Sequence, residues 1–366
     1  MKQKKKKIAF VIGALTPGGA ERVISVLSNE LIEKFEVTII TFVKSDPFYP
    51  LDSRIEVVSC FNKIDKPKSL IGSLKLNYAL TKKLSKIVKD QRIDLLIGFI
   101  TSANVLTTIA AKLNRIPCLI SERNDPLKKS IPKLWVILRK FVYPMANHLV
   151  VQTKKVKIIY ETIVKPEKIT ILPNPISPKL SESRNSSTPR EKIILSVGRL
   201  NDDKRQDKII KAFQKLNLKE WKLLLIGDGP NKKKLITLIN KSSLSHEVEI
   251  LSGIKDVGKF YNKSSLFVFT SKAEGFPNVL LEAMHFGLPC ISTDCNYGPS
   301  DLITNGKNGF LVPVNDQEAL ILKMSQLIND ENLKTQFSIE ARKTTENYMS
   351  KIVTTKWESL ILNHIK

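Results

Sequence analysis

Short apolar runs recur along the chain, and each is followed by a turn and then by a longer amphipathic stretch. Runs rich in Ile, Val, Leu and Phe are typical of buried strands, and their alternation with helical stretches is typical of a parallel sheet. In the first half, the pattern predicts strands at Ile8–Gly13, Val37–Phe42, Ile55–Ser59, Asp94–Phe99, Cys118–Ser121, His148–Gln152 and Lys168–Leu172. In the second half, it predicts strands at Lys192–Val197, Trp221–Ile226, Glu247–Leu251, Leu266–Phe269, Pro289–Thr293 and Gly309–Val312.

A segment poor in large apolar residues separates the two series of strands. Residues 173–191 are rich in Pro, Ser and charge, which is typical of a linker between domains. After the last strand, apolar residues recur at helical spacing, so we expect terminal helices that pack back on the first domain. The predicted fold is α/β, with two Rossmann-like, doubly wound parallel-sheet domains and a cleft between them. The predicted boundaries are 1–175 for the first domain, 176–191 for the linker, 192–340 for the second domain and 341–366 for the returning helix.

Composition narrows the class of protein. The chain has 366 residues with 42% hydrophobic content, enough for two packed domains of roughly 100 to 200 residues each. Its four cysteines show neither a CxxC pair nor zinc-finger spacing, so we expect buried thiols without a disulfide or a structural metal. No apolar stretch approaches the roughly 18 residues that span a bilayer, so we expect neither a spanning nor a secreted protein. The formal net charge of +24 predicts an anionic partner, such as nucleic acid, acidic lipid or a phosphorylated substrate.

Two predicted strand-to-helix loops carry groups suited to anions. Gly18 and Gly19 precede a helix, where backbone N–H groups and the helix dipole favour negative charge. The three-glycine GxGxxG spacing is absent there, which argues against a dinucleotide cofactor. Arg199 and Lys204 follow the first strand of the second domain, and together they are suited to clamp a diphosphate. A simple tight turn at the glycines and a solvated lysine are the alternatives.

The most specific pattern lies between residues 266 and 293. Glu274 follows a predicted strand, and a helix is predicted from Pro277 until Gly287 stops it, which are the usual positions of these two residue types at helix ends. Seven residues separate Glu274 from Glu282, so the first carboxylate lies in the loop and the second lies about one and a half turns into the helix. Two carboxylates so placed are suited to contact different parts of one elongated ligand. The alternative is a helix charge partner at the first position and a surface residue at the second.

Five sequence elements, in this order, resemble the GT-B glycosyltransferases of family 4, which are retaining enzymes with an E-x7-E signature. The elements are GGAE at Gly18–Glu21, VGRLNDDK at Val197–Lys204, GDGP at Gly227–Pro230, EGFPNVLLE at Glu274–Glu282 and GLPCISTD at Gly287–Asp294. The resemblance covers nearly the whole chain. It implies a GT-B fold and the transfer of a hexose or N-acetylhexosamine from a nucleotide diphosphate sugar, most often a UDP-sugar in this family.

The resemblance also implies roles for individual residues. Arg199 and Lys204 would hold the donor diphosphate and stabilise the leaving group, and Glu274 would contact hydroxyls of the transferred sugar, so these three are the predicted catalytic residues. Glu282 would accept hydrogen bonds from the ribose. The other implied donor contacts are the backbone of Gly275, Phe276, Pro277 and Asn278, the phosphate-covering Gly18 and Gly19, and the base-contacting Ile254 and Lys255.

Two further features bear on cofactors and on the acceptor. The chain contains no Asp-x-Asp motif, so we expect no metal and no other cofactor, with Lys and Arg supplying the positive charge. Many relatives place a histidine in a first-domain loop near the donor sugar. The corresponding segment here, CLISERNDP, offers Glu122 and Arg123 instead, and these are the predicted acceptor contacts.

Two basic segments of the first domain predict contact with an anionic membrane surface. Residues 126–160 hold eight Lys or Arg and no acid, interleaved with Trp135, Phe141 and Tyr143. Residues 68–89 hold many lysines and a possible apolar helical face of Leu70, Leu74, Tyr78, Leu84 and Val88. A solvated amphipathic helix is the alternative for each. With its SERNDP and NYGPSD segments, the chain resembles bacterial enzymes that extend lipid-linked O-antigen, capsule or other glycan precursors. That resemblance implies a polyprenyl-diphosphate-linked acceptor and a peripheral place at the cytoplasmic face of the inner membrane.

Three other functions compete with this one. Basicity alone would permit nucleic-acid binding, but no helix-turn-helix, RNA-recognition or zinc signature occurs, so we expect no nucleic-acid partner. A nucleotide-sugar epimerase fits the fold but not the E-x7-E pattern. An inactive scaffold of a glycan-assembly complex also fits the fold, although all four residues Arg199, Lys204, Glu274 and Glu282 are present.

Overall fold

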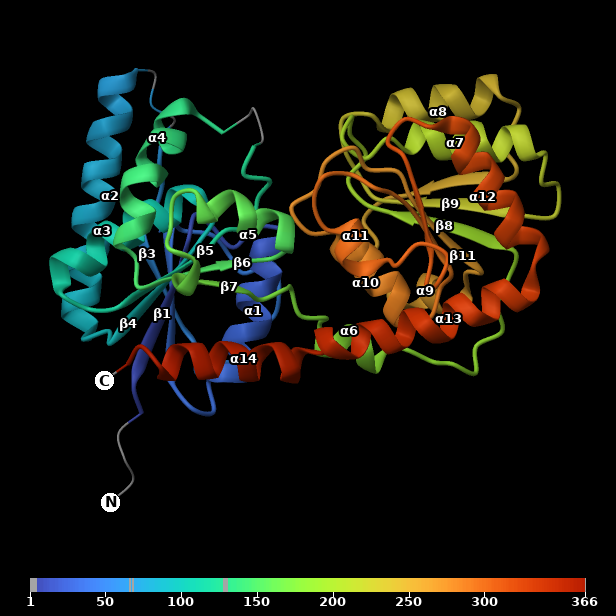
Figure 1. The fold of residues 1–366 in the computed structure, drawn as a ribbon. Helices are drawn as coiled ribbons and strands as arrows, with labels where there is room; N and C mark the ends of the chain where they lie inside the picture. Colours follow the sequence, from blue (N-terminus) through green and yellow to red (C-terminus); the bar gives the residue numbers. More distant parts are fainter. Residues whose placement is uncertain (1–4, 66, 68, 128–130, 366) are drawn as a thin grey trace. The chain divides into compact units, whose positions relative to one another are not determined.

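The computed structural model describes residues 5–65, 67, 69–127 and 131–365, and the chain forms two compact units (Figure 1). The first unit comprises residues 1–175 and 350–366, and the second comprises residues 176–349. Each unit contains one parallel sheet with helices packed on it. Every predicted strand has a counterpart whose ends differ by no more than two residues, so the predicted α/β class is confirmed.

The sheet of the first unit has the strand order β3-β2-β1-β4-β5-β6-β7, and all its pairings are parallel. The strands are β1 (Lys7–Ile12), β2 (Glu36–Val43), β3 (Glu56–Phe61), β4 (Leu95–Phe99), β5 (Cys118–Ser121), β6 (His148–Val151) and β7 (Ile169–Ile171). The direction of strand order reverses between β1 and β4, as in doubly wound folds. All residues of β4 are buried, because helices cover both faces of the sheet.

Helices α1 and α14 pack on one face of this sheet, against Ile8, Phe10 and Ile12 of β1. Helix α3 lies on the other face, with α2 and α4 beside it (Figure 1). The hydroxyl of Ser69 accepts the N–H of Gly72 (3.0 Å) and so caps the start of α2. The helical segments of this unit are α1 (Gly19–Leu31), α2 (Leu70–Gln91), α3 (Thr101–Asn114), α4 (Lys133–Val142), η1 (Tyr143–Met145), α5 (Lys154–Glu161), η2 (Pro166–Lys168) and α14 (Ser350–Leu362).

The sheet of the second unit has the order β10-β9-β8-β11-β12-β13 and reverses between β8 and β11. Its strands are β8 (Ile193–Val197), β9 (Lys222–Ile226), β10 (Val248–Leu251), β11 (Leu266–Phe269), β12 (Cys290–Thr293) and β13 (Phe310–Val312). Its helices are α6 (Pro178–Glu182), α7 (Gln206–Leu216), α8 (Lys232–Lys241), α9 (Gly258–Lys263), α10 (Asn278–His285), α11 (Pro299–Leu302), α12 (Gln317–Asn329) and α13 (Glu331–Thr345), followed by η3 (Glu346–Tyr348). Separate apolar cores on the two faces of the sheet hold α7 and α12 on one side and α9 and α10 on the other.

Residues 176–191, which we expected to be a linker, belong to the second unit and include helix α6. The guanidinium of Arg190 donates hydrogen bonds to three backbone oxygens at the ends of α9 and α10, those of Tyr261 (2.6 Å), Ser264 (2.7 Å) and Phe286 (2.7 Å). The last carbonyls of a helix need donors from outside it, so this one arginine fixes the segment to both helices. The linker prediction was wrong because it rested on a composition rich in Pro and Ser, which does not indicate this arginine contact.

The chain returns to the first unit at Ser350 and not at residue 341. Helix α13 stays in the second unit, where its Phe337 and Ala341 are fully buried. Helix α14 packs on the first unit through Trp357, whose ring stacks on Phe99 with centroids 5.9 Å apart. The expected return of a C-terminal helix is therefore confirmed for α14 alone. Apolar residues recur at helical spacing in both helices, so the sequence pattern could not tell which unit each one joins.

Trp357 is fully buried, and its removal tests the contribution of α14 to the first unit. We expect Trp357→Ala to lower the free energy of unfolding by about 3–5 kcal/mol, because it leaves a cavity against Phe99. Denaturant unfolding followed by circular dichroism measures this change. Ile352→Ala, at a 41% exposed position of the same helix, is the control and should change stability by less than about 0.5 kcal/mol. Equal effects of the two substitutions would contradict the packing described.

Candidate active site

The carboxyl ends of β8 and β11 bring together two side chains that are far apart in the sequence. Lys204 lies in the loop between β8 and α7, and Glu274 lies in the loop between β11 and α10. The Lys204 ammonium forms an ion pair with the Glu274 carboxylate, and the two side chains are 21% and 10% exposed. The ammonium also lies 5.1 Å from the centroid of the Phe269 ring. A partly buried ion pair at this edge of a sheet combines a phosphate-binding cation with an acceptor for hydroxyl groups.

The loop that carries Lys204 is braced on one side by the GDGP segment after β9. The N–H of Gly198 donates to Ile226 O (2.9 Å), and the N–H of Leu200 donates to Asp228 O (2.8 Å). A Cβ at Gly227 would overlap the carbonyl oxygen of Gly198, and a Cβ at Gly229 would overlap that of Leu200. Both glycines are therefore required for the close approach of the two loops, which is the structural role of this motif.

The other side of the loop is held by residues that directly follow β11. The hydroxyl of Thr270 lies 2.9 Å from the carbonyl oxygens of both Lys204 and Arg205. The N–H of Lys272 donates to Asp203 O (2.8 Å). Nothing in the sequence pattern singled out Thr270, because a threonine that ends an apolar strand is unremarkable without knowledge of its partner.

Arg199 lies on the same loop as Lys204, and its side chain is exposed. Its carbonyl oxygen accepts a hydrogen bond from the buried Gln206 side chain (3.1 Å), which fixes the backbone from which the guanidinium extends. The guanidinium therefore starts from a fixed point and extends into solvent. Its predicted role at a diphosphate stays a prediction.

The segment Gly275–Asn278 forms the entry to α10, which begins at Asn278 and ends at His285. Phe276 and Pro277 are buried, so they offer their backbone and not their side chains to a ligand. Gly287 adopts a left-handed conformation (φ 70°) just after the helix, as its position in the sequence predicted. A Cβ at Gly298 would overlap the ring of Pro277, so the NYGPSD segment packs tightly behind this entry.

Glu282 is 6% exposed, so the alternative that it is a surface residue is wrong. Its carboxylate accepts a hydrogen bond from the hydroxyl of Tyr261 (3.1 Å), a fully buried residue of α9. Tyr261 therefore orients Glu282, although the sequence offered no sign of this pairing. Ile254 and Lys255 lie in the loop between β10 and α9, where Ile254 packs against the core of this face and Lys255 is exposed.

In the first unit, Gly18 and Gly19 lie at the start of α1, as predicted. The carboxylate of Glu21 folds back over Gly18, where a Cβ would overlap it. Burial raises the pKa of Glu21, while a hydrogen bond from its own backbone N–H opposes that rise. A carboxylate of the chain thus lies at the helix start where we predicted phosphate.

Glu122 and Arg123, the predicted acceptor contacts, are 1% and 7% exposed. The Glu122 carboxylate accepts hydrogen bonds from five groups: Tyr143 OH (2.7 Å), Thr101 OH (2.9 Å), Arg123 N–H (3.1 Å), Tyr160 OH (3.2 Å) and Asn124 N–H (3.3 Å). The Arg123 guanidinium carbon lies 5.0 Å from the centroid of the Phe99 ring and 5.8 Å from that of the Trp357 ring, and burial lowers the pKa of Arg123 to about 9. Both side chains hold the loop after β5 in place from inside the unit, and their burial does not support direct contact with an acceptor.

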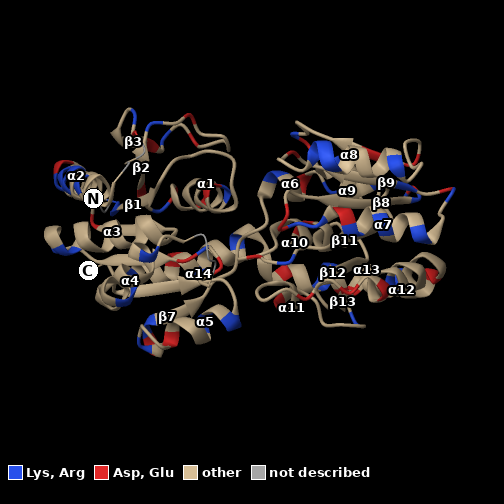
Figure 2. Cartoon of the chain, turned by 90° about the horizontal axis from the view of Figure 1, so that it is seen from above, with Lys and Arg blue, Asp and Glu red and all other residues tan. Residues whose placement is uncertain are grey.

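The two basic segments of the first unit are exposed only in part. Leu70, Leu74 and Tyr78 on α2 are 67%, 51% and 71% exposed, and Phe141 on α4 is 71% exposed. By contrast, the structure buries three of the predicted apolar anchors, Leu84, Val88 and Tyr143. Figure 2 shows Lys and Arg positions in blue on both α2 and α4.

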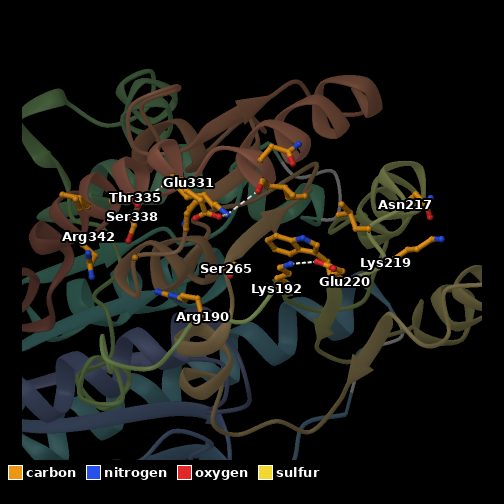
Figure 3. A pocket seen from close by; sticks show the side chains of 18 residues that line it. Arg190, Lys192, Asn217, Lys219, Glu220, Ser265, Glu331, Thr335, Ser338 and Arg342 are labelled. Carbon is orange, nitrogen blue, oxygen red and sulfur yellow. Dashed lines mark hydrogen bonds and ion pairs between the residues drawn. The ribbon is translucent and has the colours of Figure 1, made fainter.

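A cavity of about 960 Å³ in the second unit lies at the amino ends of its strands (Figure 3). Two of its acids are paired with lysines, Glu220 with Lys192 and Glu331 with Lys334. It is at the opposite edge of the sheet from Lys204 and Glu274, so it is not part of the candidate site.

Across the described residues, no three His, Cys, Asp or Glu side chains gather closely enough to hold a metal ion. Likewise, no helix in the described part of the chain is long and apolar enough to cross a bilayer.

Known proteins resemble the chain over nearly its whole length. The family model described as Glycosyltransferase Family 4 matches residues 17–180, and the one described as Glycosyl transferases group 1 matches residues 180–344. The GalNAc-alpha-(1->4)-GalNAc-alpha-(1->3)-diNAcBac-PP-undecaprenol alpha-1,4-N-acetyl-D-galactosaminyltransferase of Campylobacter jejuni is 32% identical, covering 97% of this chain and 98% of its own. The amylovoran biosynthesis glycosyltransferase AmsD of Erwinia amylovora is 27% identical, covering 97% of this chain and 99% of its own. The solved structure of Anabaena HepE in complex with UDP has the same fold, with a TM-score of 0.79 at 19% identity, covering 98% of this chain and 100% of its own.

The contact between the GDGP segment and the Lys204 loop can be tested by adding a methyl group. We expect Gly227→Ala to lower stability by at least about 2 kcal/mol more than Gly198→Ala does, because only the first methyl overlaps backbone atoms. The two glycines have nearly the same positive φ (155° and 153°), and a Cβ at Gly198 would meet nothing closer than 3.9 Å, so the pair separates overlap from backbone strain. Thermal and urea unfolding measure the difference, and equal losses would show that the two loops do not need this close approach.

Proposed function

Because this chain belongs to glycosyltransferase family 4, we propose that it transfers a hexose or N-acetylhexosamine from a nucleotide diphosphate sugar to a polyprenyl-diphosphate-linked glycan, with retention of anomeric configuration. The chain is a glycosyltransferase with two parallel α/β sheets, and its relatives act in polysaccharide biosynthesis. The epimerase alternative has no support among these relatives. The observation that carries the proposal is the Lys204–Glu274 ion pair at the carboxyl edge of the second sheet.

The ion pair supplies both kinds of group that the donor needs. The diphosphate binds the ammonium of Lys204, and Glu274 then accepts hydrogen bonds from hydroxyls of the sugar. As the glycosidic bond breaks, negative charge develops on the departing phosphate next to Lys204 and Arg199. Cations already placed at that position stabilise such charge by about 3 kcal/mol or more.

The other donor contacts extend from the same edge of the sheet. Helix α10 places the positive end of its dipole at Gly275–Asn278, where phosphate or sugar oxygens bind. Glu282, oriented by Tyr261, accepts hydrogen bonds from the ribose. Ile254 and Lys255 contact the base. The phosphate contact predicted for Gly18 and Gly19 stays a prediction, because the Glu21 carboxylate lies at the start of α1.

The donor site requires no metal ion, since the charge that a divalent cation would supply comes from Lys204 and Arg199. Thermal shift across UDP-, GDP- and dTDP-sugars in the presence of EDTA tests this. We expect one nucleotide class to raise the melting temperature selectively, by the several degrees that about 1–2 kcal/mol of binding gives at saturating ligand. A shift that appears only after Mg²⁺ or Mn²⁺ is added would contradict the metal-independent site. No shift with any nucleotide would contradict the donor site itself and favour the inactive scaffold.

The proposed acceptor follows from the relatives and from the charge of the chain. The Campylobacter enzyme is named for an acceptor joined to undecaprenol by a diphosphate, and the Erwinia enzyme is named for amylovoran, a polysaccharide. A polyprenyl-linked acceptor lies in a membrane, so the enzyme works at the cytoplasmic face of the inner membrane as a peripheral protein. The net charge of +24 favours an anionic lipid surface.

Helix α2 provides the best-defined lipid contact. None of its residues from Leu70 to Ala79 is buried, whereas its second half packs on the unit through Leu80, Leu84 and Val88. The first half therefore carries an uncovered apolar face, and lysines continue along the helix beside it. Helix α4 adds Ile137, which is 54% exposed and lies between Lys133 and Lys140, and Phe141, which directly follows Lys140. Exposed apolar residues flanked by lysines are what binding to an anionic bilayer surface requires.

Sedimentation with lipid vesicles tests this surface. We expect the protein to bind vesicles that contain phosphatidylglycerol, to bind pure phosphatidylcholine weakly, and to lose binding as salt is raised. The double substitution Leu74→Ser and Tyr78→Ser should weaken binding about tenfold or more, since it removes the buried apolar area. Leu322→Ser, at a 64% exposed position of α12, is the matched control and should bind normally. Equal binding by all three proteins would contradict the assignment to α2.

A further inference from the structure

Arg205, directly after Lys204, has an unusual backbone conformation. Its φ of 53° and ψ of 40° place it in the left-handed region, although it is not glycine and it precedes helix α7. Three other residues with positive φ, Arg92, Arg115 and Asn217, follow helix ends, where this conformation is common. The residue before a helix is normally extended, so the turn at Arg205 must be held by its surroundings.

The group that holds this turn is the hydroxyl of Thr270. Thr270 is 4% exposed, and its Oγ1 lies 2.9 Å from Lys204 O and 2.9 Å from Arg205 O. One hydroxyl hydrogen is thus shared between the carbonyls on the two sides of Arg205. The Arg205 side chain is bound elsewhere, to Asn315 Oδ1 (2.8 Å) and Asp207 Oδ1 (3.2 Å).

The same contacts fix the direction of the Lys204 side chain. The N–H of Lys204 donates to Asn201 O (3.2 Å), and its carbonyl oxygen is held by Thr270, so the peptides on both sides of its Cα are constrained. The side chain then extends toward Glu274 and the ring of Phe269. A lysine side chain has many rotamers, and a fixed starting direction lowers the entropy lost when its ammonium binds a ligand.

We propose that Thr270 is a positioning residue of the donor site, whose hydroxyl holds the left-handed turn at Arg205 and thereby directs the Lys204 ammonium at the donor diphosphate. This inference rests on the proposed function, in which Lys204 binds the diphosphate. It predicts that Thr270 affects donor binding only through Lys204.

The test compares Thr270→Val, which keeps the shape of the side chain but removes the hydroxyl, with Thr270→Ser, which keeps the hydroxyl. The probe is the nucleoside diphosphate of the class selected by the thermal-shift panel, titrated calorimetrically into the full-length protein. We expect Thr270→Val to raise Kd about tenfold and Thr270→Ser to change it less than about threefold. Thr345→Val is the matched control, since it removes a hydroxyl that is equally buried (1% exposed) and bonded to a backbone oxygen, that of Arg342 (2.7 Å). It should leave Kd unchanged.

A double-mutant cycle with Lys204→Ala separates positioning from general loss of structure. In the Lys204→Ala background, Thr270→Val should have no further effect on Kd, because the residue through which it acts is gone. Additive effects of the two substitutions would overturn the inference, as would a normal Kd for Thr270→Val. If Thr270→Val does not fold, Thr270→Ser and Thr270→Ala make the same comparison. A normal Kd for Lys204→Ala would instead overturn the proposed function of Lys204, and the inference with it.

Discussion

The loop after β8 lies between two other segments at the carboxyl edge of the second sheet, and these two segments supply the hydrogen bonds that its backbone requires. The end of β9 binds it at Gly198, the GDGP segment binds it at Leu200, and the segment after β11 binds it at Asp203 and Lys204. Backbone groups that leave water must find partners, so neighbours on the sheet edge determine the shape of this loop. The position of the Lys204 ammonium, and with it the ion pair to Glu274, follows from this constraint. The strand order that places β9, β8 and β11 side by side is therefore a condition for the chemistry as much as for the fold.

In the first unit, charged side chains near the carboxyl edge of the sheet are buried and hydrogen-bonded. The buried Glu122 carboxylate binds the hydroxyls of Tyr143 and Tyr160, and the buried Arg139 guanidinium donates to Pro126 O (2.8 Å) and to Tyr160 OH (3.3 Å). Burial of charges is costly unless hydrogen bonds compensate it, and here those bonds tie α4 and the loop after β5 to the unit. The exposed faces of α2 and α4 meanwhile carry apolar residues next to lysines.

The ion pair between Lys204 and Glu274 was not predicted, but periodicity and helix-end residues were sufficient to predict the strands, the limits of α10 and the strand-to-helix loops that carry the two side chains. Each of these depends on local sequence and on the rule that the carboxyl ends of parallel strands share one edge. Thr270, Tyr261 and Arg190 could not be predicted, because their importance lies in hydrogen bonds to residues distant in the sequence. The burial of Glu122 and Arg123, the predicted acceptor contacts, could not be predicted for a related reason. Charged residues after a strand usually face solvent, and only the tertiary structure shows that aromatic hydroxyls and rings surround these two.

The ion pair also explains how the Lys204 ammonium is stabilised in a partly buried site before a ligand binds. An unpaired ammonium at this position would lose hydration without compensation, so Glu274 stabilises the site before any ligand arrives. On the proposed function, donor binding is then an exchange of partners. The diphosphate takes the ammonium, and the sugar hydroxyls supply donors to the carboxylate that it leaves. A nucleoside diphosphate without its sugar can replace only the first contact and leaves Glu274 facing phosphate oxygens of the same sign of charge. The pair therefore favours the intact nucleotide sugar over the nucleoside diphosphate product, so that the contact which organises the empty site also promotes product release after transfer.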